Sequence, residues 1–259
     1  MPMTPTQHFR QLHQQSQPLL LPNAWDARSA AACQTAGFTA IGTSSAAMAS
    51  MLGYADGEQL PFAKLRYLVS RICASTTLPV SVDLEGGYSR DPAQIAAHVR
   101  ELAALGVVGI NLEDSVVVAG QRQLLEPATF ADTLRVLRSH CARQQLDIFI
   151  NVRTDTYLLP AEQPVRATLE RLHYYEAAGA DGLFVPGLTN LAHINELCRA
   201  TALPVNVMAL PNLPALEALA AAGVRRVSLG NFLYEAAATH QQRLSHQIRQ
   251  ERSLTALFA

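Results

Sequence analysis

Two carboxylates in the stretch SVDLEGGYSR are spaced so that they could do chemistry together. Asp83 and Glu85 are separated by one residue and follow the β-branched run at 79–82. If that run is a strand, both acids point to the same side of it. Two negative charges directed at one place repel each other. The pair therefore indicates either a bound cation or a polar strand end that runs into a turn.

A third carboxylate, Glu113, follows another apolar run of the chain. If the two strands are neighbours, Asp83, Glu85 and Glu113 face one mouth, where three carboxylates are costly without a cation. A hard divalent ion such as Mg²⁺ removes that cost, and it keeps several waters when few carboxylates hold it. A purely structural polar cluster is the alternative.

Arg153 lies inside the predicted strand INVRTD, where a charged side chain must leave the core or meet an anion. Its planar guanidinium suits a substrate carboxylate held by two parallel hydrogen bonds. An ion pair with Asp155 or Glu113 is the structural alternative. The hydroxyls and amides of residues 43–45 could hold the same anion from another side, and Asn206 ends a later strand.

Histidine and lysine are missing from the predicted strand ends, which limits the reactions that a site there could catalyse. All eight histidines fall in the N-terminal segment or in predicted helices, and Lys64, the one lysine, lies on a predicted helix. A Schiff-base lysine is therefore not available, and no GxxxxGK phosphate loop is present. A metal-bound electrophilic site with an arginine remains, which is suited to stabilising an enolate beside a carboxylate.

The elements that must position these residues alternate regularly along the chain. Glycines at 37, 106, 179 and 223 end predicted helices and lead into strands. Eight strands that alternate with helices predict a (β/α)8 barrel in a single domain, 1–259, with its active site at the carboxyl ends of the strands. The expected strands are near 18–22, 39–44, 78–83, 109–114, 147–154, 182–186, 203–208 and 225–230.

Charge and composition exclude several classes of protein. The net charge is −1 and no basic tract is present, so neither nucleic acid nor a membrane is an expected partner. Residues 1–16 are polar and predict a helix or tail, not a signal peptide. Residues 231–259 predict one or two terminal helices. Four scattered cysteines without CxxC spacing favour free thiols in the cytoplasm.

Four segments, in this order and spacing, resemble the isocitrate lyase / phosphoenolpyruvate mutase superfamily: GFTAIGTSS…LGYADGE, LPVSVDLEGGY, GVVGINLEDS and INVRTDTYL. The resemblance runs from about residue 23 to residue 231. It implies a barrel with an extra C-terminal helix that is exchanged between the subunits of a homo-oligomer, a dimer or tetramer. It also implies a small carboxylate substrate and an enolate stabilised by Mg²⁺, with Mn²⁺ as a substitute.

The resemblance assigns roles to individual residues. Glu113 and Arg153 match catalytic positions of the family. The metal positions are matched by Asp56, Asp83, Glu85 and Glu113, and the substrate-binding positions by Trp25, Asp26, Thr43, Ser44, Ser45 and Arg153, to which the strand-end Asn206 is added.

Two departures from the family pattern affect the expected reaction. Glu85 stands where relatives often have aspartate. The loop DSVVVAGQRQLLEP lacks the cysteine of the lyases and the asparagine of the phosphonomutases. As replacements for the missing acid or base, the sequence offers Ser115, Arg122, Tyr54 and Tyr88.

The candidate site residues that are present best suit a lyase that breaks a C–C bond next to a carboxylate in a small 2-oxo or 2-hydroxy acid. Decarboxylation of an oxaloacetate-type substrate needs no general base at the breaking bond, whereas cleavage of a 2-methylisocitrate- or isocitrate-like substrate needs both a base and an acid. Two alternatives remain open. One is a P–C bond enzyme, either a phosphoenolpyruvate mutase or a phosphonopyruvate hydrolase. The other is a non-catalytic 2-oxo acid binder.

Overall fold

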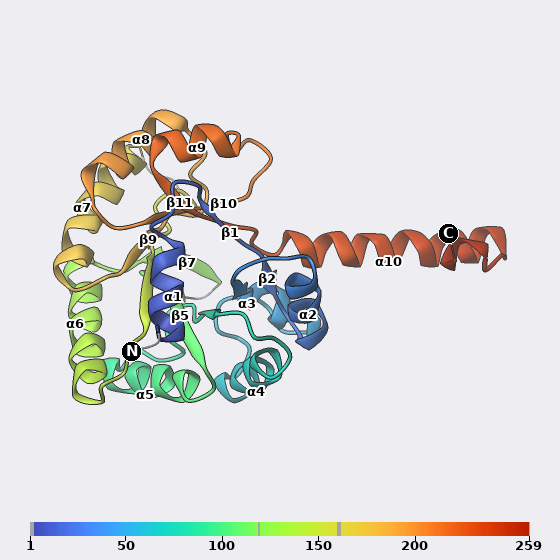
Figure 1. Cartoon of the computed structure of the whole chain (residues 1–259), viewed down its shortest axis with the longest axis horizontal. Coiled ribbons are helices and arrows are strands. Elements are labelled where there is room, and N and C mark those ends of the chain that lie inside the picture. Colours follow the sequence, from blue (N-terminus) through green and yellow to red (C-terminus); the bar gives the residue numbers. More distant parts are fainter. Residues whose placement is uncertain (1–2, 119, 160–161, 259) are drawn as a thin grey trace.

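The computed structural model describes residues 3–118, 120–159 and 162–258, and its centre is one parallel sheet (Figure 1). All eight predicted strands are present. The strands of this sheet are β1 (Leu19–Leu21), β2 (Asn23–Ala24), β3 (Ile41–Thr43), β4 (Val80–Asp83), β5 (Val107–Glu113), β8 (Phe149–Arg153), β9 (Gly182–Phe184), β10 (Val205–Met208) and β11 (Val224–Ser228).

The sheet closes on itself through the first strand segment. Its order is β1-β11-β10-β9-β8-β5-β4-β3-β2, with parallel pairing throughout. Only Pro22 separates β1 from β2, so this one stretch of chain pairs with β11 on one side and with β3 on the other. Counted as one strand, β1 and β2 complete an eight-strand barrel, and the predicted (β/α)8 fold is confirmed.

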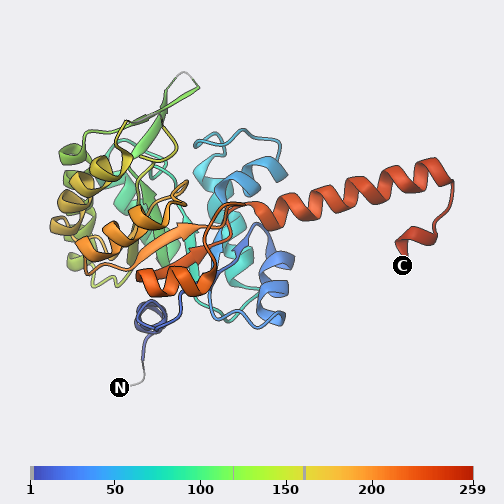
Figure 2. The same cartoon turned by 90° about the horizontal axis from the view of Figure 1, so that it is seen from above.

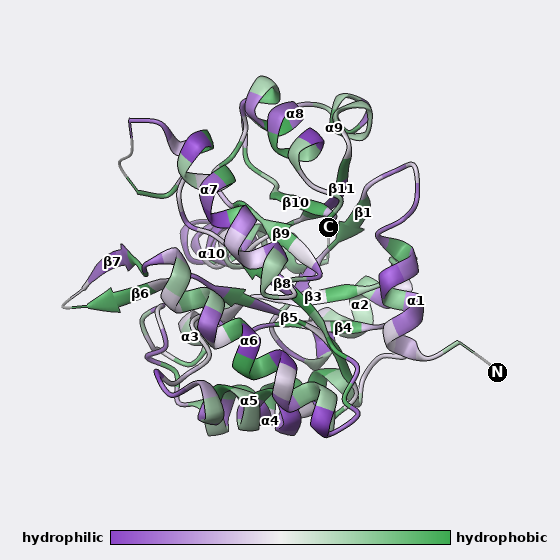
Figure 3. Cartoon of the chain, turned by 90° about the vertical axis from the view of Figure 1, so that its left-hand side faces the viewer, coloured by the Kyte–Doolittle hydropathy of each residue, from purple (hydrophilic) through white to green (hydrophobic). Residues whose placement is uncertain are grey.

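Helices surround the barrel and cover the apolar outer faces of its strands (Figures 1 and 3). Ile110, Ile150 and Val152 belong to the core that packs against these helices. The helices are α1 (Pro5–Leu12), α2 (Ala27–Thr35), α3 (Ser45–Met51), α4 (Phe62–Cys73), α5 (Pro92–Ala103), α6 (Pro127–Arg143), α7 (Pro164–Ala177), α8 (Leu191–Ala200), α9 (Leu216–Ala222) and α10 (Phe232–Glu251).

The N-terminal helix α1 closes the end of the barrel where the strands begin. Phe9 is fully buried and meets Phe149 of β8 edge to face, and His13 stacks on the same Phe149 ring. The His13 Nδ1 bonds the Phe9 carbonyl oxygen at 2.8 Å, and burial lowers the pKa of His13 to about 3. A neutral imidazole therefore completes an aromatic plug, made of Phe9, His13 and Phe149.

One local element differs from the sequence prediction. The segment after β5 was expected to be a short loop, but it forms an antiparallel hairpin of β6 (Ser115–Val118) and β7 (Gln121–Leu124) that projects from the barrel (Figures 2 and 3). The segment after β3 begins with α3. The Ser44 side chain caps this helix by accepting a hydrogen bond from the Ala47 N–H.

The C-terminal helix α10 extends away from the barrel (Figures 1 and 2). None of its residues is buried, and a short 3₁₀ turn, Thr255–Leu257, follows it. Exchange of residues 231–259 between subunits stays a prediction. Over the residues that the structure describes, no helix has the length and apolar character needed to cross a membrane.

Candidate functional site

A cavity of about 270 Å³ opens at the carboxyl ends of the barrel strands. Five of the predicted site residues line it: Ser44, Ser45, Asp56, Asp83 and Arg153. Within the described part of the chain, no histidine or lysine lines this cavity. The chemistry available there is therefore that of carboxylates, an arginine, hydroxyls and amides.

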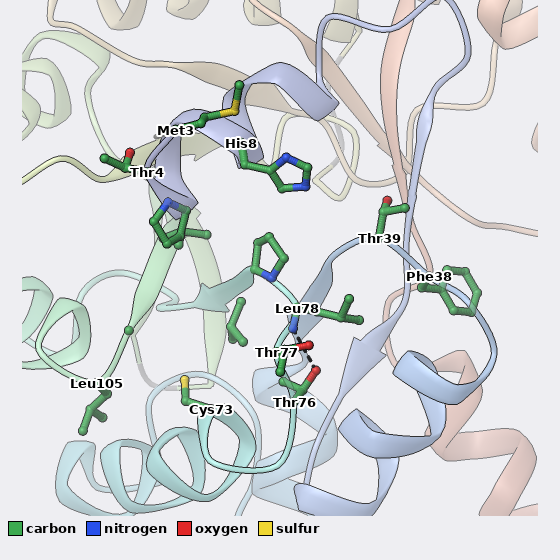
Figure 4. A pocket seen from close by; sticks show the side chains of 15 residues that line it. Met3, Thr4, His8, Phe38, Thr39, Cys73, Thr76, Thr77, Leu78 and Leu105 are labelled. Atoms are coloured by element: carbon green, nitrogen blue, oxygen red, sulfur yellow. Dashed lines mark hydrogen bonds between the residues drawn. The ribbon is translucent and has the colours of Figure 1, made fainter. Parts of the chain in front are cut away.

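A larger cavity, about 610 Å³, lies at the opposite end of the barrel (Figure 4). It is bounded by the start of α1, with Thr4 and His8, and by loop residues such as Thr76, Thr77 and Leu105. No cluster of charged side chains faces it among the described residues. Active sites of this fold lie at the carboxyl ends of the strands, so the smaller cavity is the candidate site.

Asp83 ends β4 and is held from two sides. Its Oδ2 accepts a hydrogen bond from the Ser45 hydroxyl at 2.8 Å, and its backbone N–H donates to Thr43 Oγ1 at 2.9 Å. Its other oxygen, Oδ1, is buried and has no hydrogen-bond partner among the described residues. A buried carboxylate oxygen without a donor is costly, and a bound cation or water would relieve that cost.

Arg153 ends β8, and two acids fix its guanidinium. Its Nε donates to Asp155 Oδ1 at 2.6 Å, and its Nη1 lies 3.1 Å from Glu113 Oε2. Arg122 of β7 reaches the same two acids, at 2.7 Å from each. Arg153 is therefore ion-paired, as the structural alternative predicts, and it also lines the cavity, so its binding of a substrate carboxylate stays a prediction.

The charges in this cluster shift one another's ionisation. Burial raises the pKa of Glu113 to about 7, although Arg153 beside it acts in the opposite direction. Burial also acts to raise the pKa of Asp155, but Arg153, Ser115 and Arg122 outweigh it and hold that pKa below its usual value. Burial alone would lower the pKa of Arg153, yet Glu113 and Asp155 raise it, so the guanidinium stays charged.

Glu85 departs from the predicted geometry. The argument that it points to the same side as Asp83 assumed that the strand continues, but β4 ends at Asp83 and Glu85 has a left-handed backbone, with φ of 49°. Its side chain is buried, and the residues that line the cavity do not include it. Glu85 Oε1 accepts a hydrogen bond from the Tyr88 hydroxyl at 2.9 Å, and Oε2 accepts one from the Glu58 N–H at 2.6 Å.

The other predicted residues are more scattered. Asp26 forms a capping box with Ser29 at the start of α2. Trp25 packs edge to face on Tyr234, with 5.3 Å between ring centres. Asn206 is buried inside the barrel, and its amide has no partner within the described chain. None of these three lines the cavity.

Asp83 and Asp56 line the cavity together, and they are the residues best placed to hold a metal ion. The Asp56 side chain is 51% exposed and lies 4.0 Å from Arg122. The structure does not form the predicted carboxylate cluster: across the described residues, no three His, Cys, Asp or Glu side chains could hold a metal ion together. One carboxylate oxygen without a hydrogen-bond partner, with a second carboxylate on the same cavity wall, still suits an ion that keeps most of its waters, as Mg²⁺ does.

Two residues around the site were not found from the sequence. Glu58 contacts Tyr88 and Arg90, and it gave no signal beyond following a glycine. Arg226 is 1% exposed inside the barrel, where its Nε and Nη1 have no partner among the described residues and burial lowers its pKa to about 9. The signal that identified Arg153, an arginine inside a strand, was present in VRRVS and could have found Arg226.

Comparison with known proteins places the chain in a family. The profile of the family described as phosphoenolpyruvate phosphomutase matches residues 9–249. The uncharacterized protein Rv1998c of Mycobacterium tuberculosis (strain ATCC 25618 / H37Rv) is 38% identical over 238 residues, which cover 91% of this chain and 87% of that protein. The oxaloacetate decarboxylase of Marinomonas sp. (strain MWYL1) is 28% identical over 247 residues, 90% of this chain and 83% of the relative.

A solved structure gives the same result. A protein from Burkholderia cenocepacia J2315, provisionally assigned as a phosphonomutase, superposes with a TM-score of 0.88 and 42% identity, covering 93% of this chain and 99% of the other. The barrel fold agrees with these matches. The chain therefore belongs to the phosphoenolpyruvate mutase/isocitrate lyase superfamily, and it is an enzyme of the lyase and mutase kind found there.

Proposed function

We propose that this enzyme is a Mg²⁺-dependent lyase that breaks a C–C bond next to a carboxylate, with decarboxylation of an oxaloacetate-type 2-oxo acid as the best-supported reaction. One observation carries the proposal. The unpartnered Asp83 Oδ1 and the guanidinium of Arg153 belong to the wall of one small cavity, to which neither histidine nor lysine contributes among the described residues.

The size of the cavity favours a small acid. Its volume of about 270 Å³ lies just below the range of about 300–1,000 Å³ usual for drug-sized ligands. Arg153 would bind one carboxylate of the substrate, because its neighbours Asp155 and Glu113 fix the guanidinium in place. Ser44 and Ser45 offer hydroxyls on the same wall.

Asp83 would hold the metal ion, with Asp56 reaching it through water. When bound, Mg²⁺ would supply a Lewis acid for the carbonyl oxygen of the substrate. The Ser45 hydroxyl and the Thr43 side chain orient Asp83 for that task. Mn²⁺ should substitute, since it too prefers oxygen ligands.

In the proposed reaction the bond between the substrate's methylene carbon and its β-carboxylate breaks. The carboxylate leaves as CO₂, and the electron pair of the bond becomes the enolate. The enolate carbon then takes a proton from solvent water, which gives the shorter 2-oxo acid. Such a step needs charge stabilisation more than a general base, which agrees with a cavity lined by an arginine and carboxylates.

Turnover of oxaloacetate with Mg²⁺ and with EDTA tests the proposal. We expect decarboxylation that stops with EDTA and returns when Mg²⁺ or Mn²⁺ is added. Activity that ignores the chelator would contradict the metal role. A ligand that only stabilises the protein thermally, with no turnover across a panel of 2-oxo and 2-hydroxy acids, would indicate a binder instead.

A P–C bond reaction is the second candidate, supported by the phosphoenolpyruvate phosphomutase profile and by the provisional phosphonomutase. A P–C bond enzyme should convert phosphonopyruvate when that compound replaces oxaloacetate in the turnover assay. We further propose that the protein acts in the cytoplasm as a homo-oligomer. Support comes from the four free cysteines and from α10, a helix of 20 residues of which none is buried in the single chain.

A further inference from the structure

Glu85 connects two loops that both lead to the cavity. The first loop, residues 54–58, follows α3 and carries Asp56. The second, residues 84–90, follows β4 and so continues directly from Asp83. Glu85 Oε2 accepts the Glu58 N–H at 2.6 Å, which attaches the end of β4 to the Asp56 loop two residues beyond Asp56.

The connection is reciprocal. The Glu58 side chain crosses in the opposite direction, where its Oε1 accepts the Tyr88 N–H at 2.6 Å and its Oε2 meets Arg90 Nη2 at 2.6 Å. Tyr88 closes the arrangement by donating its hydroxyl to Glu85 Oε1. Two carboxylates thus each bind the backbone of the other's loop.

The backbone of these loops shows how closely they are held. Glu58, Glu85 and Tyr88 all have positive φ, of 62°, 49° and 57°. Residues with a Cβ rarely adopt this left-handed conformation, and they keep it only where the surroundings hold them there. The crossed hydrogen bonds are the interactions that hold these three residues.

We propose that Glu85 is a positioning residue that sets Asp56 relative to Asp83, and not a metal ligand. This inference rests on the proposed function, in which these two aspartates serve the metal. It also explains why a glutamate occupies this position. An aspartate is one methylene shorter, so from the end of β4 it would not reach the Glu58 N–H and the Tyr88 hydroxyl together.

The substitutions Glu85→Asp and Glu85→Gln separate the two roles, because they are expected to act in opposite order. Glutamine keeps the length of the side chain. Its oxygen can still accept the Glu58 N–H, while its NH₂ donates to the Tyr88 oxygen, whose hydroxyl can rotate. Aspartate keeps the charge that a metal ligand needs but loses the reach. A positioning role therefore predicts that Gln is tolerated and Asp is not, and a metal ligand predicts the reverse.

Hydrogen–deuterium exchange of peptides spanning 54–60, in the metal-free protein, is the measurement. We expect exchange roughly tenfold faster in Glu85→Asp, the change that loss of one hydrogen bond allows, and near-wild-type exchange in Glu85→Gln. Glu217→Asp and Glu217→Gln, at an exposed glutamate of α9, are the matched controls. Tyr88→Phe removes only one donor and should give a smaller acceleration, which keeps the test valid if Glu85→Asp does not fold.

Equal exchange in wild type and Glu85→Asp, or equally fast exchange in both Glu85 variants, would overturn the proposal. Mg²⁺ affinity measured by calorimetry adds a second readout, which should survive in Glu85→Gln and fall in Glu85→Asp. If Mg²⁺ affinity were retained in Glu85→Asp and lost in Glu85→Gln, Glu85 would be a ligand of the metal ion. Because the exchange measurement uses neither substrate nor metal, it stands even if oxaloacetate proves not to be the substrate.

Discussion

The two ends of the barrel are built from the same strands, but different side chains fill the barrel interior at each end. Along β8, the inward positions change from Phe149 at the start, through Asn151, to Arg153 at the end. The first packs on α1, the second bonds Asn111 inside the barrel at 2.9 Å, and the third lines the cavity. One end is closed by aromatic rings, and the other holds a network of charges.

The difference indicates that one end of the barrel mainly stabilises the fold and that the other end mainly serves activity. The plug of Phe9, His13 and Phe149 gains stability from burial, where an ionised group would be costly. At the other end Arg153, Glu113, Asp155 and Arg122 compensate one another, which keeps charges available next to a cavity. Substitutions at the plug should therefore change stability alone, and substitutions at the charged end should change activity first.

The largest effect should come from Arg153→Lys. Lysine keeps the charge but loses the planar fork, so we expect kcat/KM to fall about 10²–10³-fold. Steady-state kinetics, on the substrate identified in the panel of 2-oxo and 2-hydroxy acids, would measure the fall in kcat/KM. Arg135→Lys, in an exposed pair with Asp132, is the control and should match wild type. Wild-type kinetics in Arg153→Lys would contradict the assignment of the cavity.

Phe9→Ala should show the opposite behaviour. Removal of a fully buried ring from the plug is expected to lower the free energy of unfolding by about 3–5 kcal/mol. Because the substitution lies at the far end of the barrel, kcat/KM of the folded protein should change by less than about twofold. Chemical denaturation gives the first quantity, with Tyr67→Ala as an exposed control. A large loss of activity with unchanged stability would refute the division between the ends.

Another effect concerns pH and the neutral His13. Its pKa is about 3 in the folded protein, lowered by burial from 6.5. Between these values the unfolded chain binds a proton that the folded chain does not. The contribution of neutral His13 to the free energy of unfolding is thus complete above pH 6.5, and it falls by about 1.4 kcal/mol per pH unit below pH 6.5.

Replacement of His13 by phenylalanine removes this titration and keeps a ring in the plug. The difference in unfolding free energy between wild type and His13→Phe, measured by denaturation from pH 7 to pH 4, isolates it from the titration of the acids. We expect a shallower pH dependence in the variant. Identical slopes would show that His13 is not held neutral.

The sequence predicted the barrel because its signals are local and repeated. Glycine at helix ends and apolar strand runs located all eight strands, and charged residue types at the ends of those strands located Asp83 and Arg153. The hairpin after β5 was missed because a two-stranded ribbon that projects from the barrel lacks a clear buried face: β7 alternates between exposed and half-buried residues only.

Glu85 shows where pattern reasoning stops. Alternation along a strand holds only while the strand continues, and β4 ends two residues before Glu85. The crossed contact with Glu58 joins residues 27 positions apart through loop backbone, and no spacing rule announces such a contact. Arg226, by contrast, could have been predicted, because the signal that identified Arg153, an arginine inside a strand, is also present in VRRVS.

The central claim is that Asp83 holds the metal ion of a lyase at the charged end of the barrel, and Mg²⁺ binding tests it most directly. Isothermal calorimetry on wild type and Asp83→Asn should show affinity at least about tenfold weaker in the variant. Asp132→Asn, at a side chain 76% exposed, should bind as wild type does. Equal Mg²⁺ affinity in wild type and Asp83→Asn would contradict the account.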